Sequence, residues 1–274
     1  MITSVQNPRV KAATQLRDAR QRQKQGRIII DGARELMRAL QAGVEVVEVF
    51  LCEELCRSDD CRKLVETLAE PAAPEIIYVS TKVFEKLAFG ARAEGMVGIA
   101  RTPARSLADL MLPKNSLVAV LEGVEKPGNV GAVLRSADAA GVSALIVADG
   151  GTDLYNPNAI RASLGTIFTV PVCAASSVDT LVWLHAHHLA VYAAWVDAEI
   201  EYTDADFKRP FAIVLGSEAK GLSDRWRRGM PVTGSASPIT AIKLPMLGVA
   251  DSLNVSTAAA VLFYEALRQR SNRA

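Results

Sequence analysis

The sequence predicts an α/β protein of two units, and three observations lead to this fold class. Short apolar runs alternate along the chain with segments of helical period. The runs at residues 116–121 and 211–215 are almost continuously hydrophobic, which is typical of parallel strands buried on both faces. Residues 102–106, Thr-Pro-Ala-Arg-Ser, have the composition of a linker. We therefore divide the chain into residues 1–105, a linker of residues 106–115, and residues 116–274.

Length and composition indicate a soluble globular protein. The 274 residues are half hydrophobic and carry a formal net charge of +1, which is ample for two ordinary domains. No apolar run approaches the roughly 18 residues that a membrane span needs, and the first residues lack the apolar core of a signal peptide. We therefore expect a cytoplasmic protein without membrane contacts.

Cysteines and histidines indicate no metal site. Three of the four cysteines are clustered, but they form no CxxC pair and no histidine lies near them. We expect reduced, partly buried thiols. The histidines at 185, 187 and 188 share one expected helix, and we assign them no chemistry.

The first unit opens with a basic helix expected over residues 8–25, with Pro8 near its start. Its long cationic side chains are consistent either with binding of a phosphate backbone or with a solvated helix. Gly43 and Pro71 mark the ends of two later helices. The other expected elements are strands over 27–30, 44–51, 75–79 and 96–100 and helices over 33–42, 59–69 and 81–89.

The second unit repeats the alternation of strand and helix. Gly141 closes its first helix. The expected strands cover residues 116–121, 144–147, 168–172, 190–194, 211–215 and 240–244, and the expected helices cover 130–140, 158–165, 178–187 and 255–270. Residues 255–263 form an apolar stripe that suits either a dimer seam or plain core.

Three glycine-bearing loops follow buried strands, at residues 121–141, 213–222 and 242–266. Ligands of open α/β sheets bind where strands end, and glycines let the backbone approach them closely. The spacing G-x-G-x-x-G after the first strand is absent, and so is the P-loop pattern G-x-x-x-x-G-K-[ST]. The loops therefore argue against a dinucleotide or nucleoside triphosphate site.

Three motifs in these loops resemble one known family. They are N-x-G-x-x-x-R at residues 129–135, L-G-S-E at 215–218 and S-L-N-V-S-x-A at 252–258. In order, spacing and residues they resemble the motifs of the SpoU (TrmH-type) branch of the SPOUT RNA methyltransferases, over about residues 116–270. Residues 1–105 more weakly resemble the ribosomal-protein-like α/β RNA-binding domain that precedes many members.

The resemblance implies a fold, a cofactor and a reaction. The fold would be a parallel sheet with helices on both faces and a deep trefoil knot near the C-terminus. Family members bind S-adenosylmethionine in the knot, form homodimers and methylate ribose 2′-hydroxyls of ribosomal or transfer RNA. The positions that match the cofactor site are Leu215, Gly216, Ile242, Leu244, Ser252, Leu253 and Asn254. The polar positions around the reaction match Asn129, Arg135, Glu218, Ser252 and Asn254.

Each polar position also has a structural interpretation. Because the arginine guanidinium stays protonated in proteins, we favour for Arg135 a clamp on an RNA phosphate over the role of proton acceptor. Asn129 would orient the ribose or cap a helix. Glu218 would hold a loop or a partner's arginine, or be an acid in the first turn of a helix, which the helix dipole favours. Ser252 and Asn254 equally suit the cap of the last helix.

We expect RNA contacts from the basic helix and from cationic residues beyond it: Arg9, Lys11, Arg17, Arg22, Arg34, Arg92 and Arg161. Arg161 and Ser163 suit packing equally well. The N-terminal domain favours ribosomal RNA as the substrate. The alternatives are a transfer RNA 2′-O-methyltransferase and a non-catalytic RNA-binding or ribosome-assembly factor on the same fold.

Overall fold

In the computed structural model, which describes residues 1–69, 73–89, 94–228 and 239–271, the chain forms two compact units. The first contains residues 1–104 and 155–169, and the second contains residues 105–154 and 170–274. Residues 155–169 thus leave the sequence of the second unit and join the first. The expected division at residues 105 and 116 did not foresee this excursion. No helix among the described residues is long and apolar enough to cross a membrane.

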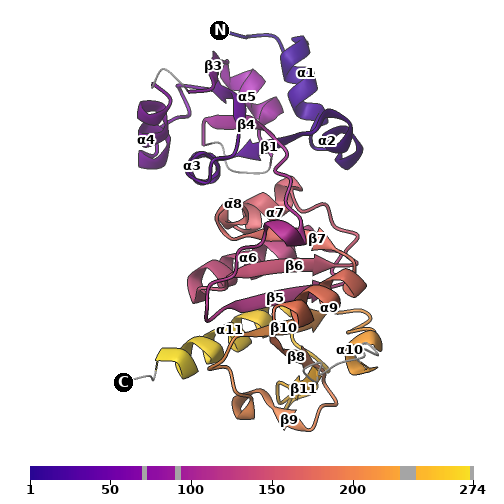
Figure 1. The fold of residues 1–274 in the computed structure, drawn as a ribbon. Coiled ribbons are helices and arrows are strands. Elements are labelled where there is room, and N and C mark those ends of the chain that lie inside the picture. The colour runs from indigo at the N-terminus through magenta and orange to yellow at the C-terminus, as the bar shows by residue number, and fades with distance from the viewer. Residues whose placement is uncertain (70–72, 90–93, 229–238, 272–274) are drawn as a thin grey trace. The chain divides into compact units, whose positions relative to one another are not determined.

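The first unit is built on a mixed four-stranded sheet of order β1-β4-β2-β3 (Figure 1). Only β2 and β3 are parallel. Apolar side chains of α1 and α5 cover one face of this sheet, where Val10 of α1 and Phe84 of α5 belong to the same buried cluster as Ile99 of β4. The elements are α1 Pro8–Gln15, α2 Ala19–Gln25, β1 Arg27–Asp31, α3 Ala33–Gln41, β2 Val46–Leu51, α4 Asp59–Thr67, β3 Glu75–Tyr78, α5 Thr81–Leu87 and β4 Met96–Arg101.

The expected basic helix over residues 8–25 is two helices. Helix α1 ends at the cap residue Leu16, and the Asp18 side chain caps α2 by accepting a hydrogen bond from the N–H of Gln21 at 3.1 Å. An aspartate at this position competes with helix continuation, because its carboxylate satisfies backbone donors of a new first turn. The sequence pattern showed the charge of the segment but not this break.

Residues 155–169 pack on the first unit as α7 (Pro157–Ala162) and α8 (Thr166–Thr169). Arg38 of α3 donates to the carbonyl of Leu164 at 2.6 Å, and Arg161 of α7 donates to that of Phe89 at 2.7 Å. Ser163 is fully buried and hydrogen-bonds within its own turn. The structure therefore assigns Ser163 to packing. The expected strand over 168–172 was wrong at its start, because Phe168 lies buried in α8 and the strand begins only at Val172.

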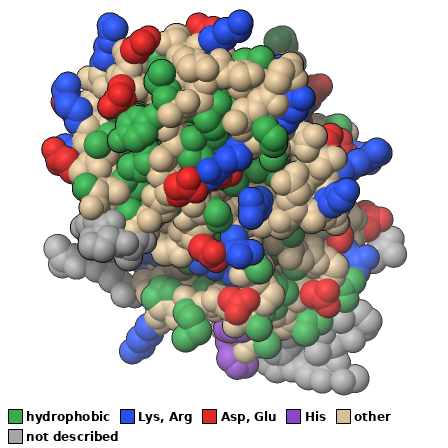
Figure 2. Space-filling model, turned by 90° about the horizontal axis from the view of Figure 1, so that it is seen from above, with side chains coloured by type: hydrophobic (Ala, Val, Ile, Leu, Met, Phe, Trp, Pro, Cys, Tyr) green, Lys and Arg blue, Asp and Glu red, His purple; other side chains and the backbone are tan. Residues whose placement is uncertain are grey.

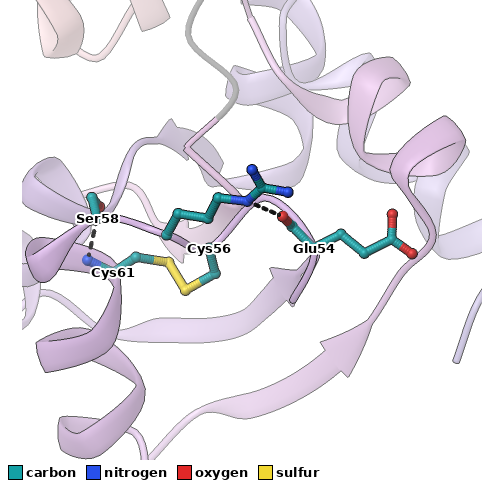
Figure 3. Close-up of a disulfide and its surroundings, with 5 residues drawn as sticks. Glu54, Cys56, Ser58 and Cys61 are labelled. Carbon is teal, nitrogen blue, oxygen red and sulfur yellow. Dashed lines mark hydrogen bonds between the residues drawn. A yellow bond between two sulfur atoms is a disulfide. The ribbon is translucent and has the colours of Figure 1, made fainter.

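A disulfide joins Cys56, in the loop before α4, to Cys61, in the first turn of α4 (Figure 3). Ser58, between the two cysteines, caps α4 by accepting from the N–H of Cys61 at 3.2 Å. Cys52 and Cys173 are free and buried. The expectation of reduced thiols is thus correct for these two and wrong for the pair, whose spacing in sequence carries no signal for the bond. No cluster of metal-ligating side chains occurs among the described residues.

The second unit is built on a parallel sheet of order β7-β6-β5-β10-β8-β11-β9 (Figure 1). Its strands are β5 Leu117–Glu122, β6 Ala144–Ala148, β7 Val172–Ala175, β8 Ala190–Ala194, β9 Ile200–Glu201, β10 Phe211–Gly216 and β11 Ile239–Lys243. Burial of β5, β6 and β10 along nearly their whole length explains their continuous apolar sequences. The trefoil knot expected from the resemblance stays a prediction.

Helices cover both faces of this sheet, as expected. On one face, α9 (Ser177–Ala186) and α10 (Arg225–Arg228) pack through Leu181 and Trp226 against Val118, Val120 and other strand residues. On the other, α11 (Val255–Ser271) packs against α6 (Pro127–Ala140) and β10. Val255, Leu262 and Phe263 are buried within the chain, so the apolar stripe of the last helix is core. The expected linker also contributes to this unit, because Leu110 is buried against the α9 face.

Asp31 generates a pH prediction for the first unit. Burial raises the pKa of its carboxyl from 3.8 to about 6, although the N–H of Phe89 donates to it at 2.6 Å and Arg161 attracts it. The folded protein therefore binds the proton more tightly than the unfolded chain. The free energy of unfolding should fall as the pH rises from about 4 to about 6, by up to about 3 kcal/mol.

The Asp31→Asn variant keeps an acceptor for Phe89 and removes the titration. We expect its stability to exceed that of the wild type at pH 7 and to converge with it near pH 4. Urea unfolding at both pH values measures the difference. A constant difference between the two proteins across this range would contradict the burial argument.

Candidate active site

Three loops of the second unit meet at the carboxyl edge of its sheet. The parallel register pairs Leu121 with Leu215 and Glu122 with Gly216, so β5 and β10 end at the same level. The loop after β5 leads into α6, and the loop after β10 forms a tight turn that closes at Gly221. The segment between β11 and α11 supplies the third loop. The three sequence motifs therefore meet at one place, as strand topology requires.

One side chain from each motif joins a polar cluster of Asn129, Glu218 and Asn254. The Glu218 Oε1 atom accepts from the Nδ2 atoms of both asparagines, at 3.0 Å from that of Asn254. Asn254 Nδ2 also lies 3.4 Å from Asn129 Oδ1. A carboxylate only accepts hydrogen bonds, so it fixes both amides with their NH₂ groups towards it. The other Glu218 oxygen has no hydrogen-bond donor within the described parts of the chain.

Asn254 caps the last helix, as expected, and also joins the polar cluster. Its Oδ1 atom accepts from the Ser256 N–H at 3.0 Å and from the Ser256 hydroxyl at 2.6 Å, which caps the start of α11. Its Nδ2 atom faces Glu218. Asn129, in contrast, is no cap: it lies inside the first turn of α6, where Lys126 is the cap residue. The side chain of Asn129 is thereby free to join the cluster.

Arg135 lies in α6 nearly two turns beyond Asn129 and is exposed. Within the described residues it forms no ion pair or hydrogen bond with a side chain, and it does not contact the polar cluster. Arg135 and Asn129, which were expected near one end of the sheet, are thus not in contact within the chain. The guanidinium is available to a ligand.

Beside the cluster lies a cavity of about 480 Å³. Its volume is in the range of small-molecule sites. Five of the expected cofactor positions line it: Leu215, Gly216, Leu244, Ser252 and Leu253. Glu218 lines it as well, whereas Ile242 is fully buried in β11 and Asn254 lies outside the lining.

Sequence reasoning missed the wall formed after β8. Trp195, Val196 and Asp197 line the cavity, together with Arg227 of α10. Arg227 lies 4.0 Å from the Trp195 ring centroid and binds both Asp197 oxygens, at 2.6 and 2.7 Å, which lowers the pKa of Asp197. No motif marks this wall, which is at the site because β8 is parallel to β10 and also ends at this edge.

The basic residues expected to bind RNA are largely engaged within the first unit. Arg9 pairs with Glu48 and Glu75, Arg34 pairs with Asp60, and Arg17 donates to three carbonyls at the end of α5. Arg22 is 3% exposed and donates to the Leu16 carbonyl at 2.7 Å, so it holds the α1–α2 junction instead of offering charge to a ligand. Lys11 is exposed, and Arg92 lies outside the described residues.

On the face drawn in Figure 2, basic side chains lie interspersed with acidic ones and do not gather into one patch. Arg9 and Arg34 each form ion pairs with acidic side chains. A charge count over the N-terminal residues therefore overstated the cationic surface of the first unit.

Comparison with known proteins places these motifs in a family. The model of the SpoU rRNA methylase family matches residues 116–264, and that of the MRM3-like substrate-binding domain matches residues 7–98. The chain belongs to the SpoU rRNA methylase family. Both matches fall on the regions where the sequence resemblance was found.

Relatives of the whole chain carry the same two parts. The 23S rRNA (uridine(2479)-2′-O)-methyltransferase of Streptomyces viridochromogenes is 29% identical, over 91% of this chain and 85% of that protein. The crystal structure of an RNA 2′-O ribose methyltransferase is 41% identical, with a TM-score of 0.85 over 98% of this chain and 99% of that one. The SpoU methyltransferase AviRb of Streptomyces viridochromogenes, in complex with AdoMet, is 26% identical, with a TM-score of 0.84 over 97% and 99%.

The cavity fits S-adenosylmethionine, the cofactor of this SpoU family protein. Leu215, Leu222 and Leu244 offer apolar contacts to an adenosine, and the carboxylates of Glu218 and Asp251 complement a sulfonium cation. The turn after β10 packs so closely on Gly216 that it leaves no room for a side chain there. A Cβ atom on it would lie 2.1 Å from the carbonyl carbon of Gly221.

We predict that Gly216→Ala forces the 216–222 turn open, because the added methyl group meets backbone that cannot move alone. The affinity for S-adenosylmethionine should fall about tenfold or more. Isothermal titration calorimetry without RNA measures the loss.

Gly128→Ala is the matched control. A Cβ atom there meets nothing within 4 Å, so cofactor affinity should stay within about twofold of the wild type. Equal affinities of the two variants would contradict the need for a glycine at 216.

Proposed function

We propose that this SpoU family protein transfers a methyl group from S-adenosylmethionine to a ribose 2′-hydroxyl of ribosomal RNA. The observation that carries the proposal is the cluster of Asn129, Glu218 and Asn254 beside the cavity, one residue from each of three motifs. Relatives named as 23S rRNA 2′-O-methyltransferases match nearly the full chain, including the N-terminal domain. This supports ribosomal over transfer RNA.

When bound, the cofactor supplies an electrophilic methyl group on a sulfonium centre. The protein must align the 2′-oxygen with this group and assist the loss of the hydroxyl proton. We assign the alignment to Asn129 and Asn254, whose amides are fixed by Glu218. The second Glu218 oxygen accepts no hydrogen bond from the described residues, and we propose that it accepts the hydroxyl proton.

We assign Arg135 to the RNA phosphate next to the modified ribose. A guanidinium is protonated and binds phosphate through paired hydrogen bonds, and this one has no protein partner in the described structure. We prefer this clamp to a role as proton acceptor, because an arginine guanidinium stays protonated in proteins. Ser252, exposed at the cavity wall, is proposed to contact the cofactor.

The decisive experiment incubates the protein and labelled S-adenosylmethionine with unmodified ribosomal RNA and, separately, with transfer RNA. We expect a labelled 2′-O-methyl nucleoside from ribosomal RNA alone. Arg135→Ala should lower transfer by about 10- to 100-fold, the loss of one charge-assisted contact, and leave cofactor affinity unchanged.

Each other outcome identifies an alternative. Label in transfer RNA alone would keep the chemistry and replace the substrate. Cofactor binding without label in either RNA or in ribosomal subunits would favour a non-catalytic RNA-binding factor. Full transfer by Arg135→Ala would contradict the assigned clamp.

We further propose that the protein acts in the cytoplasm as a homodimer. Leu247 and Val249, in the loop before α11, are fully exposed, and Tyr264 and Leu267 of α11 are also exposed. Exposed apolar groups on neighbouring segments suit contact with a second copy. Arg135 of one subunit would then be free to serve the polar cluster of the other.

Light scattering during gel filtration tests the dimer. We expect a mass near twice 29.4 kDa. The double variant Leu247→Glu and Val249→Glu should shift the mass towards the monomer, because it places charges in the contact. A monomeric wild type at micromolar concentration would contradict the proposal.

A further inference from the structure

Glu122 is a buried carboxylate that the reaction does not use. It is the last residue of β5 and is 6% exposed, at the end of a strand whose other five residues are apolar. Within the described residues it forms no ion pair. Burial of a charge without a cation is costly, so the carboxylate must be held by hydrogen bonds.

Three hydrogen bonds hold this carboxylate, and they come from two segments. The hydroxyl of Ser177, the first residue of α9, donates to Oε1 at 2.8 Å. Ser223 donates twice, from its N–H to Oε2 at 2.7 Å and from its hydroxyl to Oε1 at 2.8 Å. Ser223 directly follows Leu222, which lines the cofactor cavity.

Glu122 thereby touches both ends of the turn after β10. At the start of the turn, Gly216 is its register partner in the sheet. At the end, Ser223 returns to its carboxylate. Between these points the turn is closed by the Gly221 N–H, which donates to the Ser217 carbonyl at 2.8 Å. The turn is therefore compact, and Glu122 holds both of its ends.

The 216–223 turn contributes residues both to the cavity and to the polar cluster. Gly216, Ser217 and Leu222 line the cavity, and Glu218 lines it and joins the polar cluster with Asn129. Asn129 lies in α6, the helix that follows β5 and Glu122 in the chain. A shift of the turn relative to β5 would therefore change the cavity and the cluster together.

We propose that Glu122 is a positioning residue, which sets the 216–223 turn against β5 and so shapes the cofactor site. It contacts neither the cavity nor the polar cluster. Its hydrogen-bond geometry matters more than its charge. The inference concerns cofactor binding and does not depend on which RNA is methylated.

Glu122→Ala and Glu122→Gln separate these contributions. Alanine leaves the three donors without their acceptor, and we expect the dissociation constant for S-adenosylmethionine to rise about tenfold or more. Glutamine can accept from the Ser223 N–H and donate to both serine hydroxyls, since a hydroxyl also accepts. The glutamine variant should bind the cofactor within about threefold of the wild type. Calorimetry without RNA gives the affinities, and hydrogen exchange of residues 216–223 should increase only in the alanine variant.

Two serine variants test the proposal if Glu122→Ala does not fold. Ser223 and Ser177 donate to the same Oε1 atom at the same distance, but only Ser223 belongs to the turn. We expect Ser223→Ala to weaken cofactor binding by several-fold and Ser177→Ala to leave it unchanged, with similar thermal stability of the two variants.

Three results would overturn the proposal: wild-type cofactor affinity in Glu122→Ala, equal losses in the two serine variants, or a Glu122→Gln variant as weak as alanine. These results are read from cofactor binding alone. A failure of RNA methylation with intact binding would instead contradict the proposed function and leave the role of Glu122 standing.

Discussion

Parallel pairing of β5 with β10 is the constraint on which the site depends. The pair lies in the interior of the seven-stranded sheet, and both strands are buried on both faces. Because parallel strands end at the same edge, the register brings the loops of two distant motifs to one level. The third motif joins them through the hydrogen bonds of Asn254 with Glu218. Hydrophobic burial of the strands fixes the backbone, and the polar cluster can form only because the backbone is held in this arrangement.

The fold of the second unit was largely predictable, because nearly continuous apolar runs mark buried parallel strands and Gly141 marks a helix end. The segment around Phe168 was misread, since its apolar residues suit a strand equally well. They form α8 because this face is buried against α3 of the first unit, a contact that local pattern cannot contain. The break at Asp18 was missed for a related reason. An aspartate within a polar helix looks like one more charged residue until its cap is seen.

The residues of the candidate site that belong to the three motifs were predictable from the sequence. The cavity-lining residues outside the motifs were not. Leu215, Gly216, Leu244, Ser252 and Leu253 line the cavity, whereas Trp195 and Asp197 carry no motif and required the strand order. The charge of a residue in the sequence was the least reliable guide to its role in the structure. The sequence shows that Arg9 and Arg22 are cationic, but their partners, Glu48, Glu75 and the Leu16 carbonyl, are brought to them only by the fold.

The excursion of residues 155–169 limits how modular this protein is. The chain passes between the units after residue 104, after residue 154 and after residue 169, so the first unit is not one continuous piece of sequence. Expression of residues 1–104 alone would leave uncovered the surfaces of β1 and α3 that α7 and α8 bury. A chimera that exchanges the N-terminal domain with that of a relative would need to exchange the β6–β7 connection with it. Arg38 and Leu164 belong to one interface although 126 positions separate them in the sequence.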